Sequence, residues 1–249
     1  MKLIFLGTSH GIPTEQRFCS SAALELDGKL YLIDAGAPIV DMLLRCDRHP
    51  GAIRAVFCTH HHGDHTDGLL NLTDLCGWAY KTADFDVYVT REEQAELIPA
   101  CVALASNITS PERLRYHVAH EGELFDDGHV KITYIPTRHC EPYPSYAVLV
   151  EAEGKRLLFT GDLSGMIAKN DFPSIAMECE TELVVCEMAH FGKSEIEPYA
   201  KALKTRRLIF NHVNFPEGMD KFADIEKMAS SGEYPFPISA AYDGEIIEI

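Results

Sequence analysis

Thr59-His60-His61-His62-Gly63-Asp64-His65 places four histidines and an aspartate within seven residues, directly after the apolar run at residues 53–58. Imidazole and carboxylate groups are the ligands that hold zinc and similar divalent ions in proteins. The apolar run is typical of a strand, and a strand followed by a turn is stiff enough to orient such ligands. An affinity tag also carries histidines, but a tag lies at a terminus and lacks an internal Gly-Asp. The stretch therefore predicts a metal site.

The spacing inside this stretch indicates two groups of ligands. His60 and His62 lie two residues apart, so on extended backbone both rings can point to one side and share an ion. Asp64 and His65 come from the other limb of the turn and could hold a second ion. These four residues supply only about half of the ligands that two ions need, so we expect the missing ligands at the ends of later strands.

Three later residues follow strand-like runs. His139 comes after residues 134–138, Asp162 after residues 157–161, and His212 after residues 208–211. Taken alone, a histidine or aspartate at a strand end is more often a cap or a surface residue. The interpretation of these three as ligands therefore depends on the histidine stretch that precedes them.

Hydrophobic periodicity predicts a mixed α/β chain. Short strands are expected at residues 2–6, 21–26, 30–34, 53–58, 130–135, 146–151, 156–160, 183–186, 207–210 and 245–249, and helices at residues 38–46, 66–80, 196–203 and 221–230. The strands come in groups that look antiparallel, which favours sheets covered by helices over a doubly wound parallel sheet. No Pro/Gly/Ser linker separates the halves, so one domain over residues 1–249 is expected.

These motifs resemble those of the metallo-β-lactamase superfamily. Thr59-His60-x-His62-x-Asp64-His65, then His139, Gly161-Asp162 and His212 match the ligand motifs of that superfamily in order, across almost the whole chain. The resemblance implies its fold, a four-layer αββα sandwich in which two sheets pack together between outer helices. The coarse pattern of strands agrees with this fold.

The resemblance also implies two metal ions held by histidine and aspartate side chains. The ligands of one ion are His60, His62 and His139, those of the other are Asp64, His65 and His212, and Asp162 bridges the two. Two such ions share a water and lower its pKa towards neutrality, so the implied nucleophile is a metal-bridging hydroxide. Zinc is the expected ion, although manganese and iron suit the same ligands.

Two aspartates refine the comparison. The antibiotic-hydrolysing members of the superfamily carry a cysteine where this chain has Asp162, which argues against true β-lactamase activity. Asp34, at the end of the strand over residues 30–34, matches a superfamily position that orients a ligating imidazole. The alternative for Asp34 is a plain turn aspartate.

Within the superfamily, the chain resembles the ribonuclease Z and cyclic-phosphodiesterase branch. The opening Phe5-Leu6-Gly7-Thr8-Ser9-His10-Gly11-Ile12-Pro13-Thr14 and the segment His62-Gly63-Asp64-His65-x-x-Gly68-Leu69 both have that branch's form. The resemblance implies phosphodiester hydrolysis, with Asp64, Glu187 and His190 as candidate catalytic residues. Glu187 matches a glutamate of the branch, and His190 could supply the proton to the leaving group. His10 is a second candidate for that proton, and a structural histidine beside a packed Phe191 is the alternative for His190.

Other features of the branch are missing. Nothing between Lys81 and His120 resembles the basic arm with which ribonuclease Z proteins grip transfer RNA, and their His-Ser-Thr motif is absent before His212. The formal net charge is −16, from 38 acidic and 22 basic residues. These observations predict a small phosphodiester as substrate and make structured nucleic acid an unlikely partner. A thioester hydrolase of the glyoxalase II type and a non-catalytic metal-binding regulatory protein remain as alternative functions.

The cysteines indicate a reducing compartment. All eight are scattered without any Cys-x-x-Cys, and several lie inside apolar runs, where a thiol behaves as a small hydrophobe. No segment approaches the roughly 20 apolar residues that a membrane span requires. A cytoplasmic protein without a membrane partner is expected, and the sequence leaves a homo-oligomer open.

Overall fold

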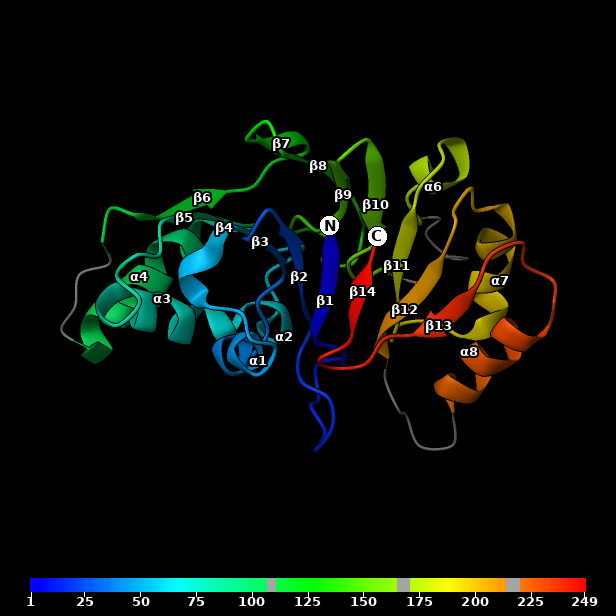
Figure 1. The fold of residues 1–249 in the computed structure, drawn as a ribbon, viewed down its shortest axis with the longest axis horizontal. Coiled ribbons are helices and arrows are strands. Elements are labelled where there is room, and N and C mark those ends of the chain that lie inside the picture. The colour runs from blue at the N-terminus through cyan, green and yellow to red at the C-terminus, as the bar shows by residue number, and fades with distance from the viewer. Residues whose placement is uncertain (107–110, 165–170, 214–219) are drawn as a thin grey trace. The chain divides into compact units, whose positions relative to one another are not determined.

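The computed structural model describes residues 1–106, 111–164, 171–213 and 220–249. Its backbone contacts form two compact units (Figure 1). The first unit consists of Met1–Ala119 together with Tyr242–Ile249, and the second of His120–Ala241. That the two units form one domain over residues 1–249 stays a prediction.

The first unit contains a seven-stranded sheet in the order β14-β1-β2-β3-β4-β5-β6. Its strands are β1 (Lys2–Gly7), β2 (Ser21–Leu26), β3 (Lys29–Ile33), β4 (Ile53–Phe57), β5 (Phe85–Val89), β6 (Leu114–Val118) and β14 (Ile246–Glu248). Pairing from β14 to β3 is antiparallel, whereas β3, β4, β5 and β6 run parallel. Parallel neighbours end at the same edge of a sheet, so the loops after β3 and β4 lie side by side.

Helices cover one face of this sheet (Figure 1). They are α1 (Ile39–Arg45), α2 (Gly63–Thr66), α3 (Gly68–Trp78) and α4 (Glu92–Ser106), with a short 3-10 turn η1 (Pro50–Ala52). In α3, Leu69, Leu72 and Cys76 recur at helical spacing and are fully buried against the sheet. This stripe fixes the start of α3, and with it α2 and the histidine loop that precede the helix.

The second unit contains a seven-stranded sheet in the order β13-β12-β11-β10-β9-β8-β7. Its strands are β7 (Gly122–Asp126), β8 (Val130–Pro136), β9 (Tyr146–Ala152), β10 (Lys155–Phe159), β11 (Leu183–Met188), β12 (Leu208–Val213) and β13 (Ile238–Ala240). β7 to β10 pair antiparallel, and β10 to β13 pair parallel. The helices α6 (Ile175–Glu178), α7 (Lys193–Ala202) and α8 (Lys221–Ser230) lie along one face, where Ile196 and Ile225 join the core.

The elements expected from the sequence are present, with bounds that differ by a few residues. The expected helix at residues 66–80 is split into α2 and α3, and the helical segment begins earlier, at Gly63. The elements β5, α4, β6, β7, α6 and β13 were not expected. The expectation of antiparallel groups holds for half of each sheet and is wrong for β3 to β6 and β10 to β13, which are parallel.

Candidate metal centre

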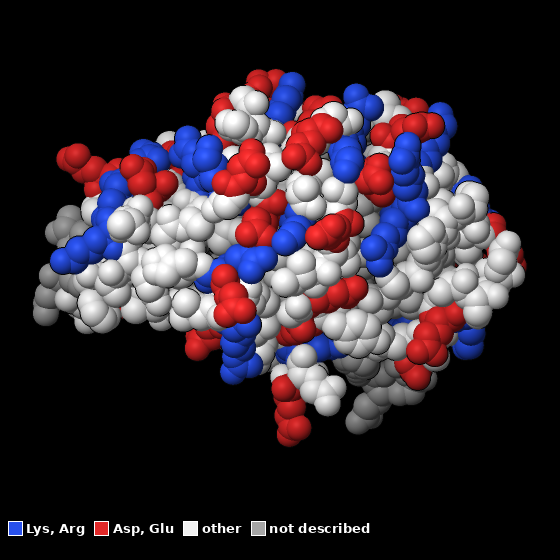
Figure 2. Space-filling model, viewed as in Figure 1, with Lys and Arg blue, Asp and Glu red and all other residues white. Residues whose placement is uncertain are grey.

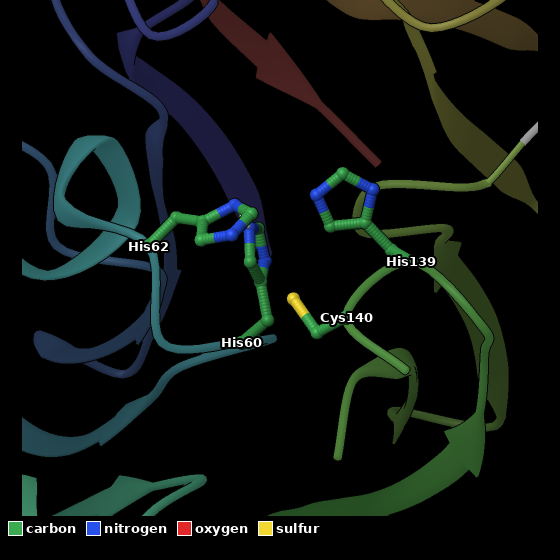
Figure 3. Close-up of side chains that lie close together, drawn as sticks. All are labelled: His60, His62, His139 and Cys140. Carbon is green, nitrogen blue, oxygen red and sulfur yellow. Dashed lines mark hydrogen bonds between the residues drawn. The ribbon is translucent and has the colours of Figure 1, made fainter. Parts of the chain in front are cut away.

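In the first unit, the loop after β4 brings His60 and His62 together. The fully buried His60 has its Nε2 atom 3.1 Å from Nδ1 of His62, and its Nδ1 atom 3.0 Å from the Thr59 hydroxyl oxygen. Figure 3 shows the two rings next to each other on this loop. Ligand nitrogens on a tetrahedral zinc ion lie about 3.3 Å apart, given Zn–N bonds of about 2.0–2.1 Å. The pair is therefore spaced to share one ion.

Asp34 sets the orientation of His65. Its Oδ2 atom lies 2.8 Å from His65 Nδ1, and its Oδ1 atom accepts hydrogen bonds from the Thr59 amide at 2.7 Å and the Thr59 hydroxyl at 3.0 Å. With Nδ1 held in this way, Nε2 of His65 is the nitrogen that can ligate a metal, and it lies 3.4 Å from Asp64 Oδ2. Asp34 adopts a φ of 62°, a conformation uncommon for residues other than glycine. These contacts favour the orienting role of Asp34 over a plain turn.

In the second unit, three imidazoles surround one carboxylate. Oδ2 of the buried Asp162 lies 3.2 Å from His212 Nε2, 3.6 Å from His139 Nε2 and 3.9 Å from His190 Nδ1. Potential ligand atoms of His139, Asp162 and His190 all lie within 4.8 Å of one another. Neutral imidazoles and a carboxylate are the donors that zinc, manganese and iron share. The residues present therefore fit a divalent metal.

Strand direction explains why these side chains meet. Asp162, Glu187 and His212 lie at or just beyond the carboxyl ends of β10, β11 and β12, which are parallel neighbours. β8 pairs antiparallel with β9, and β9 with β10, so β8 runs in the direction of β10 and delivers His139 to the same edge. The sequence separates these residues widely, and the sheet brings them together.

Glu187 organises the loop that carries His190. Its buried carboxylate accepts hydrogen bonds from the amides of Leu163 at 2.7 Å, Ala189 at 2.7 Å and His190 at 3.0 Å. It also lies 2.9 Å from His190 Nδ1. The partly exposed His190 ring is thus held through Nδ1, and Nε2 becomes the nitrogen that can exchange a proton with a substrate. His10, in the first unit, instead accepts a hydrogen bond from the Ile12 amide at Nδ1, at 2.9 Å.

The structure adds residues that the sequence did not single out. Buried Asp171 accepts hydrogen bonds at Oδ2 from the amides of Arg138 at 3.1 Å and Ser164 at 3.0 Å, so it ties the loop of His139 to the loop of Asp162. No motif surrounds Asp171 in the sequence, and only the fold shows its role. Cys140 directly follows His139 in the same loop (Figure 3) and its side chain is buried. A thiol is a further donor that suits zinc.

The other buried thiols are not candidates for a nucleophile. Burial raises the pKa of Cys76 to about 12 and also raises the pKa of Cys58 and Cys186, so these groups stay protonated near neutral pH. The eight cysteines all lie in the described part of the chain, and the structure contains no disulfide among them. In the part of the chain that is described, no helix is both long and apolar enough to cross a membrane.

The sequence resembles known proteins along most of its length. The sequence model of the family "Anti-Pycsar protein Apyc1" matches residues 1–230. Ribonuclease Z of Thermosynechococcus vestitus is 37% identical over 158 residues, which are 63% of this chain and 38% of that protein. Ribonuclease BN of Cronobacter sakazakii is 33% identical over 158 residues, which are 62% of this chain and 51% of that protein. The chain thus spans about half, or less, of the length of these curated relatives.

Solved structures confirm the fold. Human tRNase Z, short form, superposes with a TM-score of 0.75 at 20% identity, covering 100% of this chain and 99% of that one. The metallo-β-lactamase fold protein YhfI from Bacillus subtilis superposes with a TM-score of 0.78 at 17% identity, covering 100% of this chain and 99% of that one. The expected α/β class with two large sheets of the metallo-β-lactamase type is therefore correct.

These relatives overturn one expectation. The missing basic arm and the −16 net charge made structured nucleic acid an unexpected partner, but curated relatives are named ribonuclease Z, so that expectation is wrong. The physical reason is that exposed charges are screened beyond about 8–10 Å, and net charge does not describe the field near a site. On the face drawn in Figure 2, basic and acidic side chains are interspersed. Net charge alone cannot exclude an anionic substrate.

Proposed function

We propose, on the premise that the chain belongs to the family of anti-Pycsar protein Apyc1, that it is a metal-dependent phosphodiesterase acting on a small phosphodiester. The observation that carries the proposal is the group of three imidazoles around the Asp162 carboxylate, with the Glu187-held His190 among them. A ribonuclease cleaves phosphodiester bonds, so the names of the curated relatives support the same reaction type.

The proposed cofactors are two divalent ions, with zinc as the first choice. Their ligands would be His60, His62 and His139 for one ion, Asp64, His65 and His212 for the other, and Asp162 between them. The 3.1 Å separation of the His60 and His62 nitrogens and the burial of Asp162 support this set. When bound, such ions supply Lewis acidity at the phosphoryl oxygens and lower the pKa of water.

The remaining residues would orient and move protons. Asp34 holds Nδ1 of His65, which keeps that imidazole in one tautomer with Nε2 available to a metal. Glu187 holds Nδ1 of His190, which leaves Nε2 of His190 to donate a proton to the departing oxygen. General acid catalysis of this kind typically contributes about 10²–10⁴ in rate.

RNA cleavage is the second candidate, favoured by the names ribonuclease Z and ribonuclease BN of the curated relatives. A single panel separates the candidates: a nitrophenyl phosphodiester, 3′,5′-cyclic nucleotides, precursor transfer RNA and a model thioester. Each substrate is assayed with the chelated protein and after addition of zinc. A cytoplasmic location for this activity stays a prediction.

The proposal expects zinc-dependent hydrolysis of at least one small phosphodiester. Cleavage of transfer RNA alone would favour the second candidate, and hydrolysis of the thioester alone would favour an enzyme of the glyoxalase II type. A zinc-loaded protein that hydrolyses none of the four substrates would contradict both enzyme candidates and favour a metal-binding regulatory protein.

A further inference from the structure

Lys221 is a buried cation that none of the expected roles uses. It is the first residue of α8 and only 4% of its surface is exposed. Its Nζ atom donates hydrogen bonds to the carbonyl oxygens of Met188 at 2.8 Å and Ala189 at 2.7 Å. Burial lowers the pKa of Lys221, and the carboxylates of Glu187 and Glu195 oppose this effect. A lysine in this environment is costly to bury unless its donors are used.

The position is also unfavourable for the helix itself. The N-terminus of a helix carries partial positive charge, so an acidic residue stabilises the first turn and a lysine does not. Asp220 already caps α8 by accepting a hydrogen bond from the Ala223 amide at 3.0 Å. A residue that breaks a local rule in this way points to a role outside its own helix. The two carbonyl contacts show where that role lies.

Lys221 contacts the short segment Met188-Ala189-His190, which carries the His190 ring. Glu187 accepts hydrogen bonds from the amides of Ala189 and His190, at 2.7 Å and 3.0 Å, while Lys221 donates to the carbonyls of Met188 and Ala189. The segment is therefore held by an anion on its amide groups and by a cation on its carbonyl groups. Its backbone has little freedom to rotate, and the ring of His190 is fixed with it.

We propose that Lys221 is a positioning residue for His190: by holding the carbonyls of Met188 and Ala189, it keeps Nε2 of His190 in the place from which a proton reaches the leaving group. This inference rests on the proposed phosphodiesterase function. It assigns Lys221 no contact with the substrate. A purely packing role for the aliphatic stem of Lys221 is the alternative that the experiment must separate.

The experiment compares Lys221→Met, which keeps the stem and removes the donors, with Lys221→Arg, which keeps a cation and its N–H groups. Lys227→Met is the matched control, because Lys227 lies on the same helix with a side chain that is 67% exposed. Two quantities are measured on the zinc-loaded proteins. One is hydrogen exchange of the peptide that contains Ala189 and His190, and the other is the ratio of kcat for an unactivated phosphodiester to kcat for a nitrophenyl phosphodiester.

In Lys221→Met, we expect exchange of this peptide to become at least tenfold faster and the kcat ratio to fall at least tenfold, because only the poor leaving group needs the proton. Lys221→Arg is expected to recover part of both changes, and Lys227→Met to show neither. Unchanged exchange would show that the donors of Lys221 do not hold the segment, and faster exchange with an unchanged kcat ratio would show that holding the segment does not serve proton transfer. Either result would overturn the proposal. If the wild type hydrolyses no phosphodiester, the proposed function fails. The exchange of this peptide in Lys221→Met then still shows whether Lys221 holds the segment: faster exchange means that it does, and unchanged exchange means that it does not.

Discussion

At the scale of single residues, the contact between His65 Nδ1 and Asp34 determines which imidazole nitrogen is available to a metal. Asp34→Asn keeps the size of the side chain but removes the anionic acceptor shared by His65 and Thr59. We expect zinc affinity to fall about 10–100-fold, the usual effect of losing such a supporting partner. Competition with a chromogenic chelator measures this affinity. Unchanged affinity with an unchanged circular dichroism spectrum would show that Asp34 does not support a ligand.

The second prediction at this scale concerns the proton donor. His190→Asn should lower kcat for an unactivated phosphodiester about 10²-fold or more, because general acid catalysis is lost, and should affect a nitrophenyl phosphodiester much less. His129→Asn is the control, since His129 is an exposed histidine in the turn between β7 and β8 of the same unit. Equal losses on both substrates would assign His190 a structural role and remove the basis for the role of Lys221.

Asp171 gives a third prediction, because it connects two loops through backbone amides. Asp171→Ala leaves the amides of Arg138 and Ser164 without their shared acceptor. Because both contacts are only partly buried, we expect the loss of each hydrogen bond to cost about 0.5–1.5 kcal/mol. We expect weaker zinc binding together with a lower free energy of unfolding, measured by denaturant titration of the chelated protein. A variant with wild-type zinc affinity would show that the two loops keep their positions without Asp171.

At the scale of elements, an ion-pair network joins β5 and β6 in the first unit. Asp86 on β5 lies 2.8 Å from Arg115 Nε and 2.7 Å from His117 Nε2, both on β6. Burial alone would raise the pKa of Asp86, but the hydrogen bonds from Arg115 and His117 outweigh burial and lower it. A carboxyl group whose pKa is lower in the folded state stabilises the fold above its unfolded pKa, near 3.9, and that stability is lost as the pH falls through its folded pKa.

The corresponding prediction is that Asp86→Asn lowers the free energy of unfolding by about 1–2 kcal/mol near pH 7, and that this difference shrinks as the pH falls below about 4. Asp84→Asn is the control, because Asp84 pairs with the same Arg115 but its side chain is 64% exposed. Urea titrations of the three proteins between pH 3 and pH 7 measure the effect. A difference that does not depend on pH would exclude the ionised form of Asp86 as its source.

Element by element, the sequence predicted the strands that alternate or run apolar beside clear turns, such as β2 and β4. It did not predict β5 and β6, although each of these five-residue strands alternates apolar and polar residues. The network of Asp86, Arg115 and His117 is revealed only by the pairing of the two strands. The ligand types followed from the histidine loop and the resemblance. The partners Asp171 and Lys221 could not be predicted, since each acts on backbone groups of loops that are distant in sequence.

At the scale of the whole molecule, the net charge of −16 was the least reliable guide to function. Charges of both signs are interspersed on the surface in Figure 2, and screening limits each of them to its own neighbourhood. The ligand motifs, in contrast, are found in both units, and the resemblance they carry predicted the fold correctly. Local chemistry at strand ends is therefore more informative about function than global composition.

Metal binding should also contribute to the stability of the whole molecule. An ion present at 100 times its dissociation constant stabilises the folded state by about 2.7 kcal/mol, which corresponds to roughly 5–10 °C in Tm for a chain of this size. Calorimetry of the chelated protein, before and after addition of zinc, measures this shift. Magnesium at the same concentration is the control, because it binds imidazole poorly. Equal melting temperatures with and without zinc would argue against a bound ion.

The central claim is a phosphodiesterase that depends on two metal ions, and a titration of the chelated protein with zinc tests it most directly. The rate of hydrolysis of a nitrophenyl phosphodiester is followed as zinc is added in fractions of one equivalent. We expect negligible activity without zinc and a rate that saturates at two equivalents per chain. Full activity in the chelated protein, or no hydrolysis at any amount of added zinc, would contradict the claim.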